Sequence, residues 1–119
     1  MAEDGKSLEG LSGINYTEAM ERFAGNESLY QRLAIKFLDD PHYEALKCAL
    51  DKGDTEQAHQ EAHSLKGIAG NLSFSPLYQI ASLISDALRA GDTQTALDHS
   101  AELDEAYTAV IASLRSIKE

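Results

Sequence analysis

Apolar residues recur every three or four positions along most of the chain, which is the spacing of one face of an α-helix. Three stripes follow it: Ala58, Ala62, Leu65, Ala69 and Leu72; Leu77, Ile80, Ile84 and Ala87; and Ala96, Ser100, Leu103, Tyr107, Val110, Leu114 and Ile117. Only two prolines and few β-branched runs interrupt this pattern. It predicts an all-α fold whose helices bury one stripe each in a shared core.

Start and stop signals divide these stripes into separate helices. Residues 52–55 (Lys-Gly-Asp-Thr) and 90–93 (Ala-Gly-Asp-Thr) each offer a glycine to end one helix and an aspartate to cap the next. Ser75 is expected to cap another helix, with Pro76 at its first position. Because such loops are short, neighbouring helices must run antiparallel. The sequence therefore predicts an antiparallel up-down four-helix bundle.

A short extra helix should precede the bundle. Asn15 is expected to be its N-cap, and it should stop at residues 25–26 (Gly-Asn). The next helix should run from about Ser28 to Lys52. Its first apolar stripe is Tyr30, Leu33 and Phe37. Pro41 lies within this helix and should either kink it or break it, since proline removes a backbone hydrogen bond.

A length of 119 residues is enough for one domain, which we expect at residues 14–119 after a flexible lead or linker stub at residues 1–13. The net charge of −10 disfavours nucleic acids and anionic membranes as partners. Cys48, the only cysteine, forms no internal disulfide and is expected to be a small core residue in a reducing compartment. Without an apolar leader or membrane span in the sequence, we expect a cytoplasmic monomer.

The predicted helix over residues 54–72 is unusual on the side away from its apolar stripe. With the stripe at about 0°, the other positions are Lys66 at about 80°, His59 at about 100°, Gly70 at about 120°, His63 at about 140° and Gly67 at about 180°. Glycine inside a helix costs about 0.8–1.0 kcal/mol relative to alanine. Two outward glycines therefore predict a bare surface on which another protein reaches the ring of His63.

The residues beside His63 fit the transfer of a charged group. Neutral imidazole is a nucleophile near pH 7, and Lys66, one turn along, would offset the charge of a phosphorylated ring. The sequence contains no Gly-rich phosphate loop, no kinase motif and no obvious acidic metal site. We therefore expect a phosphoryl carrier that is not itself an enzyme.

The run His63-Ser64-Leu65-Lys66-Gly67, continued by residues 68–72 (Ile-Ala-Gly-Asn-Leu), resembles the signature of the histidine phosphotransfer (HPt) family of two-component phosphorelays. The likeness extends from Ile14 to the C-terminus. It implies a four-helix bundle whose His63 receives a phosphoryl group from one receiver-domain aspartate and passes it to another. Lys66 would then steady that group, while Gly67 and Gly70 would open the docking surface.

The resemblance also implies partners and further site residues. The partners would be response-regulator receiver domains and a hybrid sensor histidine kinase, in the same chain or another. This chain would hold no metal or cofactor, because the Mg²⁺ ion would belong to the receiver. Candidates for docking or for support of His63 are Gly67, Gly70, His59, Ser64, Asn71, Ser85 and Arg89. Two positions depart from the family: Ser85 stands where Gln or Glu is frequent, and Ser73 where Gly is common.

Two other functions stay open. In one, His63 is incidental, and the bundle is a docking module whose acidic surface binds a basic partner. In the other, His59 and His63 bind a metal, since their spacing of four residues suits zinc. Glu61 is out of register for the known zinc-protease helix motif, and that face has no thiol or carboxylate. His42 and His99 are expected to be solvated.

Overall fold

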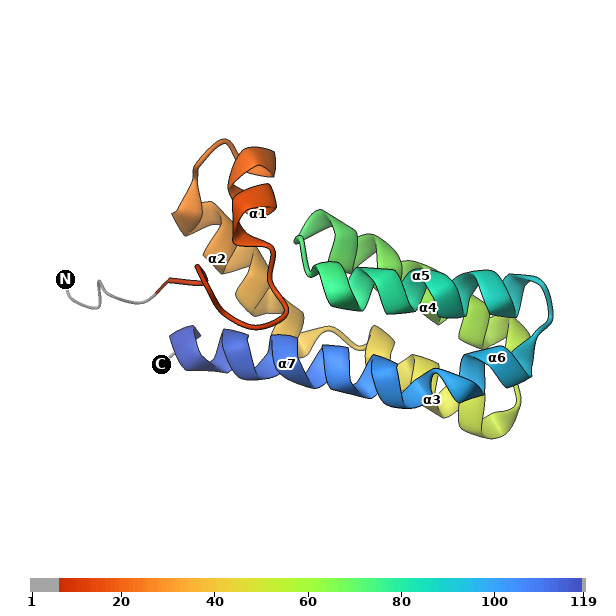
Figure 1. The fold of residues 1–119 in the computed structure, drawn as a ribbon. Coiled ribbons are helices and arrows are strands. Elements are labelled where there is room, and N and C mark those ends of the chain that lie inside the picture. The colour runs from red at the N-terminus through yellow and green to blue at the C-terminus, as the bar shows by residue number, and fades with distance from the viewer. Residues whose placement is uncertain (1–6, 119) are drawn as a thin grey trace.

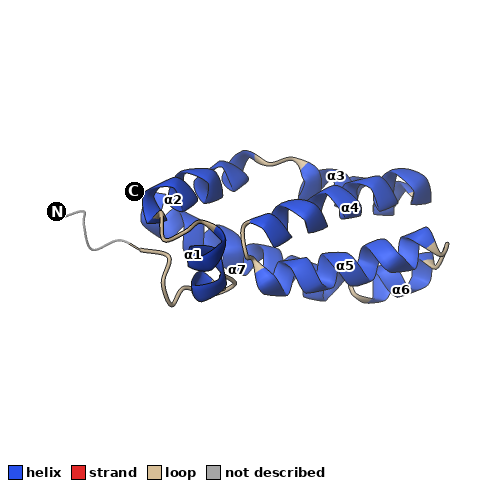
Figure 2. Ribbon diagram, turned by 90° about the horizontal axis from the view of Figure 1, so that it is seen from above, coloured by secondary structure: helices blue, strands red, loops and turns tan. Residues whose placement is uncertain are grey.

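The computed structural model describes residues 7–118, and the regular structure within them is entirely helical (Figure 1). The elements are α1 (Tyr16–Arg22), α2 (Glu27–Ile35), the 3-10 helix η2 (Lys36–Asp39), α3 (His42–Lys52), α4 (Thr55–Asn71), α5 (Ser75–Arg89), α6 (Thr93–Asp98) and α7 (Ser100–Lys118). Helices α3, α4, α5 and α7 form the predicted antiparallel four-helix bundle, and α1 and α2 lie at one end of it (Figure 2). Between residues 7 and 118, no helix is both long and apolar enough to cross a membrane.

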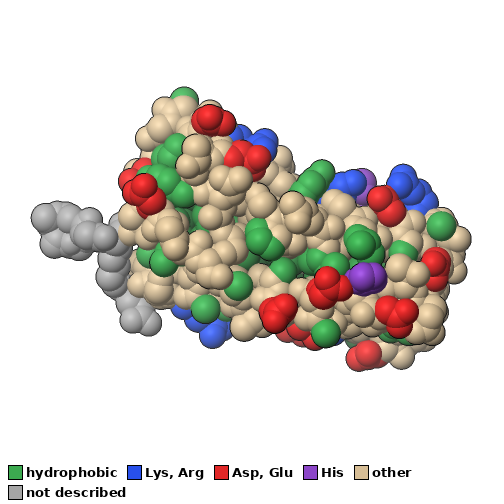
Figure 3. Space-filling model, viewed as in Figure 1, with side chains coloured by type: hydrophobic (Ala, Val, Ile, Leu, Met, Phe, Trp, Pro, Cys, Tyr) green, Lys and Arg blue, Asp and Glu red, His purple; other side chains and the backbone are tan. Residues whose placement is uncertain are grey.

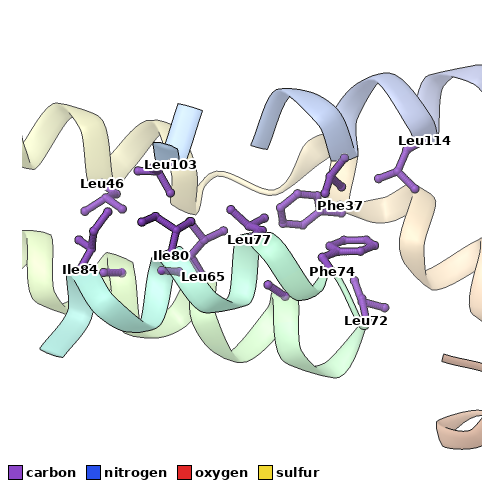
Figure 4. Close-up of a cluster of buried hydrophobic side chains, with 14 of the residues drawn as sticks. Phe37, Leu46, Leu65, Leu72, Phe74, Leu77, Ile80, Ile84, Leu103 and Leu114 are labelled. Atoms are coloured by element: carbon purple, nitrogen blue, oxygen red, sulfur yellow. The ribbon is translucent and has the colours of Figure 1, made fainter. Parts of the chain in front are cut away.

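The stripes predicted for the last three bundle helices meet in one core (Figure 4). Its largest members include Leu46, Leu65, Phe74, Leu77, Ile84, Leu103 and Leu114. Burying a side chain of this size contributes about 1.5–3 kcal/mol, so this core accounts for most of the stability of the bundle. The stripe predicted for α2 is partly wrong, because Leu33 is 36% exposed and Ala34 is buried instead. Tyr30, Ala34 and Phe37 set the buried face there.

Pro41 breaks the predicted helix over residues 28–52 rather than kinking it. Proline disfavours helical geometry in the residue before it, and Asp40 is extended, with φ −73° and ψ 130°. The Asp40 carboxylate then accepts a hydrogen bond from the backbone N–H of His42 at 3.2 Å and contacts its ring Nδ1 at 2.9 Å. His42 is therefore half-buried and paired, which corrects the expectation that it is solvated.

Two other predicted positions are wrong. Cys48 is exposed, because α3 buries Leu46, Ala49 and Leu50 and residue 48 falls between them on the outer side. His99, expected to be solvated, is half-buried and contacts Glu102 at the junction between α6 and α7. The apolar stripe over residues 96–117 is therefore divided between α6 and α7. A hydrophobic repeat predicts which face of a helix is buried, but it does not predict whether the backbone forms one continuous helix.

The segment expected to be a flexible lead is in part packed on the bundle. Residues 1–6 lie outside the described part of the chain, whereas Leu8 is fully buried. The Ser113 hydroxyl on α7 donates to the backbone oxygen of Ser12 at 2.7 Å. The expectation therefore does not hold for residues 7–13, whose few apolar groups find a surface that only the folded bundle supplies.

A polar cluster joins α3 to α7. The Tyr43 and Tyr107 rings stack with centroids 3.7 Å apart, and the Tyr43 hydroxyl donates to Asp104 at 2.5 Å. Lys47 bonds the Ser100 hydroxyl at 2.6 Å and pairs with Asp104 at 2.9 Å. Burial opposes ionisation of Asp104, but the hydrogen bonds from Tyr43 and Lys47 hold the pKa of its carboxyl below the usual value. The cluster closes the bundle on the side where these two helices meet.

The turn after α4 explains both the start of α5 and the departure at Ser73. The Phe74 N–H bonds the Ala69 oxygen at 2.9 Å and the Ser73 N–H bonds the Gly70 oxygen at 3.2 Å, a Schellman turn. Its left-handed residue is Ser73, with φ 59°. Phe74 then occupies the N-cap position, so Ser75 is the first residue of α5 instead of its cap. The prediction placed the N-cap of α5 one residue too late, at Ser75, because it did not include this turn.

Ser73→Gly should raise the melting temperature. A left-handed backbone costs a residue with a Cβ atom about 1–2 kcal/mol, and the Ser73 hydroxyl is buried with no hydrogen-bond partner among residues 7–118. The extra chain entropy of glycine offsets about 0.5–1 kcal/mol of that gain. We expect a net stabilisation of about 1 kcal/mol in thermal unfolding. Ser73→Ala, which removes only the hydroxyl, is the control and should gain less; an unchanged or lower melting temperature for Ser73→Gly would contradict this account.

Candidate functional site

Helix α4 holds His63 on the surface opposite its buried face. The Asp54 side chain caps the helix by accepting from the Gln57 N–H at 3.1 Å, and Gly53 ends α3 with φ 72°, both as predicted. The side chains that face the core are small, apart from one leucine: Ala58, Ala62, Leu65 and Ala69. Since the core fixes the rotation of the helix, the exposed His63 points away from the bundle.

A groove of about 580 Å³ opens beside His63, between α4, the first turns of α5, and α1. Predicted site residues on its α4 wall are His63, Lys66, Gly67, Gly70 and Asn71. The other four predicted positions do not line it. His59 lies one turn before His63, with ring centroids 6.3 Å apart, and Ser64 is partly buried. Ser85 is buried in α5, and Arg89 is exposed and pairs with Asp86 at 2.7 Å.

His63 and Lys66 are both without a polar partner. Within residues 7–118, neither side chain makes a hydrogen bond or an ion pair, in a protein with twenty acidic residues and ten basic ones. An unpaired lysine one turn from an exposed imidazole leaves its ammonium group available to an anion. The ring of His63 is equally accessible, because no carboxylate or backbone oxygen occupies its nitrogens.

The two glycines have different surroundings, which corrects the expectation that both point into open space. A Cβ atom at Gly67 would meet nothing within 4 Å. A Cβ atom at Gly70 would lie 3.0 and 3.1 Å from two ring carbons of Tyr78 on α5. Gly70 therefore lets the Tyr78 ring, which is 40% exposed, lie close against α4. The bare strip beside His63 is made by Gly67, and Gly70 serves close packing.

Sequence reasoning missed the residues that α1 and α5 bring to the groove. Glu18 and Arg22 of α1 form its far wall, with the Arg22 guanidinium 3.7 Å from the Glu18 carboxylate. The Asn15 N–H at the start of α1 bonds the Ser73 oxygen at 2.8 Å, which places this helix over the α4–α5 turn. No local signal in residues 16–22 indicates that contact. Tyr78 had a weak signal, since it is an aromatic residue outside the Leu77, Ile80 and Ile84 stripe.

The alternative metal site at His59 and His63 has no third ligand. Among residues 7–118, no group of three or more His, Cys, Asp or Glu side chains is placed to hold a metal ion.

Comparison with known proteins identifies the family. The family model of the Hpt domain matches residues 38–113, which include His63, Lys66 and both glycines. The chain belongs to the Hpt domain family. No curated protein and no solved structure matches it. Domains of this family carry phosphoryl groups on histidine in two-component phosphorelays. Helices α1 and α2 lie outside the matched Hpt residues, although α1 forms one wall of the groove.

The different surroundings of the two glycines predict different effects of alanine. Gly67→Ala should stabilise the domain by somewhat under about 1 kcal/mol, because it adds helix propensity in open space. Gly70→Ala should stabilise the domain less than Gly67→Ala does, or should destabilise it, because the new Cβ atom would displace the Tyr78 ring. In a Tyr78→Ala background the two substitutions should have similar effects in thermal unfolding. Equal effects in the wild-type background would show that the Tyr78 ring does not restrict position 70.

Proposed function

We propose that this Hpt domain is a phosphocarrier in which His63 accepts a phosphoryl group from a receiver-domain aspartate and passes it to the aspartate of another receiver. The observation that carries the proposal is the geometry at His63: an exposed imidazole with free nitrogens, beside an unpaired Lys66 and the bare backbone at Gly67. An incidental surface histidine needs none of these neighbours. The family supports histidine as the carrier residue.

In the forward step, the lone pair of an unprotonated ring nitrogen of His63 attacks the phosphorus of the receiver's aspartyl phosphate. A nitrogen–phosphorus bond forms while the phosphorus–oxygen bond to the aspartate breaks. The bonding electrons leave with the aspartate carboxylate, and the proton on the other ring nitrogen stays in place. Transfer to the second receiver is the reverse of this step, so the cycle needs no further reactant.

The neighbours of His63 have separate roles in this step. Lys66 places a positive charge next to the phosphoryl oxygens and lowers the free energy of the phosphorylated ring. Gly67 leaves room for the receiver backbone to approach until the reacting atoms are about 3–3.5 Å apart. In this scheme, activation of the acyl phosphate, with its Mg²⁺ ion, belongs to the receiver. The domain thus stores and presents the group, and the receiver assists the chemistry.

His63→Gln should abolish phosphoryl acceptance and leave the fold intact. The glutamine amide is not a nucleophile, and an exposed position away from caps and core changes stability by less than about 0.5 kcal/mol. The measurement is acid-labile, base-stable labelling after incubation with a phosphorylated receiver, alongside a thermal melt. His59→Gln, one turn away, is the matched control and should still be labelled. Labelling of His63→Gln at the wild-type rate would refute the proposal, and absence of label on the wild type with every donor would favour a docking module.

Lys66→Ala should slow the transfer or shorten the lifetime of the phosphohistidine without stopping the chemistry, because Lys66 supplies charge and no nucleophile. Lys66→Arg, which retains the charge, should restore most of the rate. Raising the salt concentration should slow the wild type towards the Lys66→Ala rate, since ions screen an exposed charge. Rates are measured with a phosphorylated receiver at low and high salt. Identical rates for Lys66→Ala and wild type under both conditions would show that Lys66 has no part in transfer.

A further inference from the structure

A second groove, of about 490 Å³, lies between α5 and α7. Neither His63 nor Lys66 lines it, and it shares only Gln79 with the first groove. Its apolar side chains come from both helices: Ile80 and Leu83 from α5, and Ala106 and Ala109 from α7. In Figure 3 apolar side chains are visible between these helices, bordered by acidic side chains along α7. The phosphocarrier function proposed above makes no use of this surface.

The apolar part of the groove is a recess rather than a scattered surface residue. Leu83 is 39% exposed, which by itself is ordinary for a soluble protein. Here, however, Leu83 stands beside the partly exposed Ala106 and Ala109, whose small side chains leave α7 open to close approach. Such a hollow between two helices fits the apolar side chains of a third helix.

The groove is about two helical turns long, and a loop closes it at one end. The lining residues span 76–83 on α5 and 102–109 on α7, each about 10 Å, or two helical turns. The loop at Ser12 and Gly13 closes one end, held by the hydrogen bond between the Ser113 hydroxyl and the Ser12 oxygen. A Cβ atom at Gly13 would lie 3.0 Å from Val110 Cγ2, so this loop packs directly on α7. The recess is therefore preformed.

The charge of the rim indicates which kind of partner fits. Glu102 and Glu105 border the recess, and none of its lining residues, all within the described part of the chain, is Lys or Arg. Glu105 is exposed and makes no ion pair within residues 7–118. A second copy of this chain would bring its own net charge of −10 against this rim, which is repulsive. A segment with basic residues beside its apolar face has the complementary charge.

We propose that the α5–α7 groove is a docking site for a short amphipathic helix of a partner protein, with apolar side chains over Leu83 and Ala106 and with Lys or Arg beside Glu102 and Glu105. The proposal does not depend on the phosphocarrier function. A partner bound there leaves His63 exposed, because the two grooves open on different sides of α5. The domain can then be held by one protein while it exchanges phosphoryl groups with another.

The test uses two synthetic helical peptides with leucines at positions i, i+3, i+4 and i+7, one with Lys and one with Glu at the remaining positions. Binding to the full chain is measured by calorimetry, and the site is mapped by amide chemical shifts. The Lys peptide should shift residues of α5 and α7 around Leu83, and the Glu peptide should not bind. Strong binding of both peptides, or shifts centred on α4, would overturn the proposal.

Matched variants separate the groove from general attraction to an acidic protein. Leu83→Asp should weaken binding of the Lys peptide at least about tenfold, the cost of losing one buried leucine contact. Leu97→Asp, at a leucine that is 44% exposed on α6 outside the groove, should change it less than about twofold. Glu105→Lys should weaken binding more than Glu56→Lys, which alters the net charge equally at an exposed site on α4. Equal effects within each pair would mean nonspecific adsorption and would overturn the proposal.

Two further measurements keep the outcome decisive. Thermal unfolding followed by circular dichroism reports the folding of each variant without any partner. If Leu83→Asp fails to fold, the Glu105→Lys and Glu56→Lys pair decides alone. Sedimentation velocity of the unliganded chain should show a monomer. A dimer that Leu83→Asp dissociates and Leu97→Asp does not would identify a second copy as the occupant and overturn the inference of a basic partner helix.

Discussion

The buried turn between α4 and α5 constrains the rest of the structure. Leu72, Ser73 and Phe74 are all buried, so the backbone oxygens of this turn need hydrogen-bond donors from elsewhere in the chain. Tyr30 of α2 donates its hydroxyl to the Leu72 oxygen at 2.5 Å, and the Asn15 N–H bonds the Ser73 oxygen at 2.8 Å. These two bonds hold α1 and α2 against the end of the bundle. Because α1 stands there, the surface beside His63 becomes a groove with a wall that carries Arg22.

Helix α4 shows how its neighbours can hold a helix of low intrinsic stability in place. Gly67 lowers its intrinsic stability, and its buried face consists mostly of alanines, which bury little area. The Asp54 cap and the Schellman turn satisfy its two ends, and close contact with α3 and α5 holds its sides. The neighbours thus stabilise the helix, and its exposed face is left open to meet a partner.

The two grooves differ in electrostatics, although both adjoin the start of α5. The groove at His63 brings together Lys66, which is unpaired, and Arg22, which is paired with Glu18. The groove between α5 and α7 has Glu102 and Glu105 on its rim and no cation among its lining residues, all of which are described. A phosphoryl group is attracted to the first and repelled by the second, and a basic helix has the opposite preference. The two grooves therefore favour ligands of opposite charge.

Periodicity and caps were sufficient to predict the four-helix bundle, since the stripes at 58–72, 77–87 and 96–117 and the caps at Asp54 and Asp92 are local features. The exposure of His63 and Gly67 followed from the same periodicity, because rotation about a helix axis is set by its buried face. The surroundings of Gly70 were not determined locally, because they depend on the Tyr78 ring, which α5 brings against α4. The α1 wall of the groove was beyond any sequence pattern, since Asn15 and Ser73 are far apart in the sequence and meet only in the folded chain. The sequence by itself determined the helices α4 and α5 and the faces they bury, because periodicity and helix signals are local. The tertiary structure decided what stands opposite each exposed face, because those contacts join segments that are distant in the sequence.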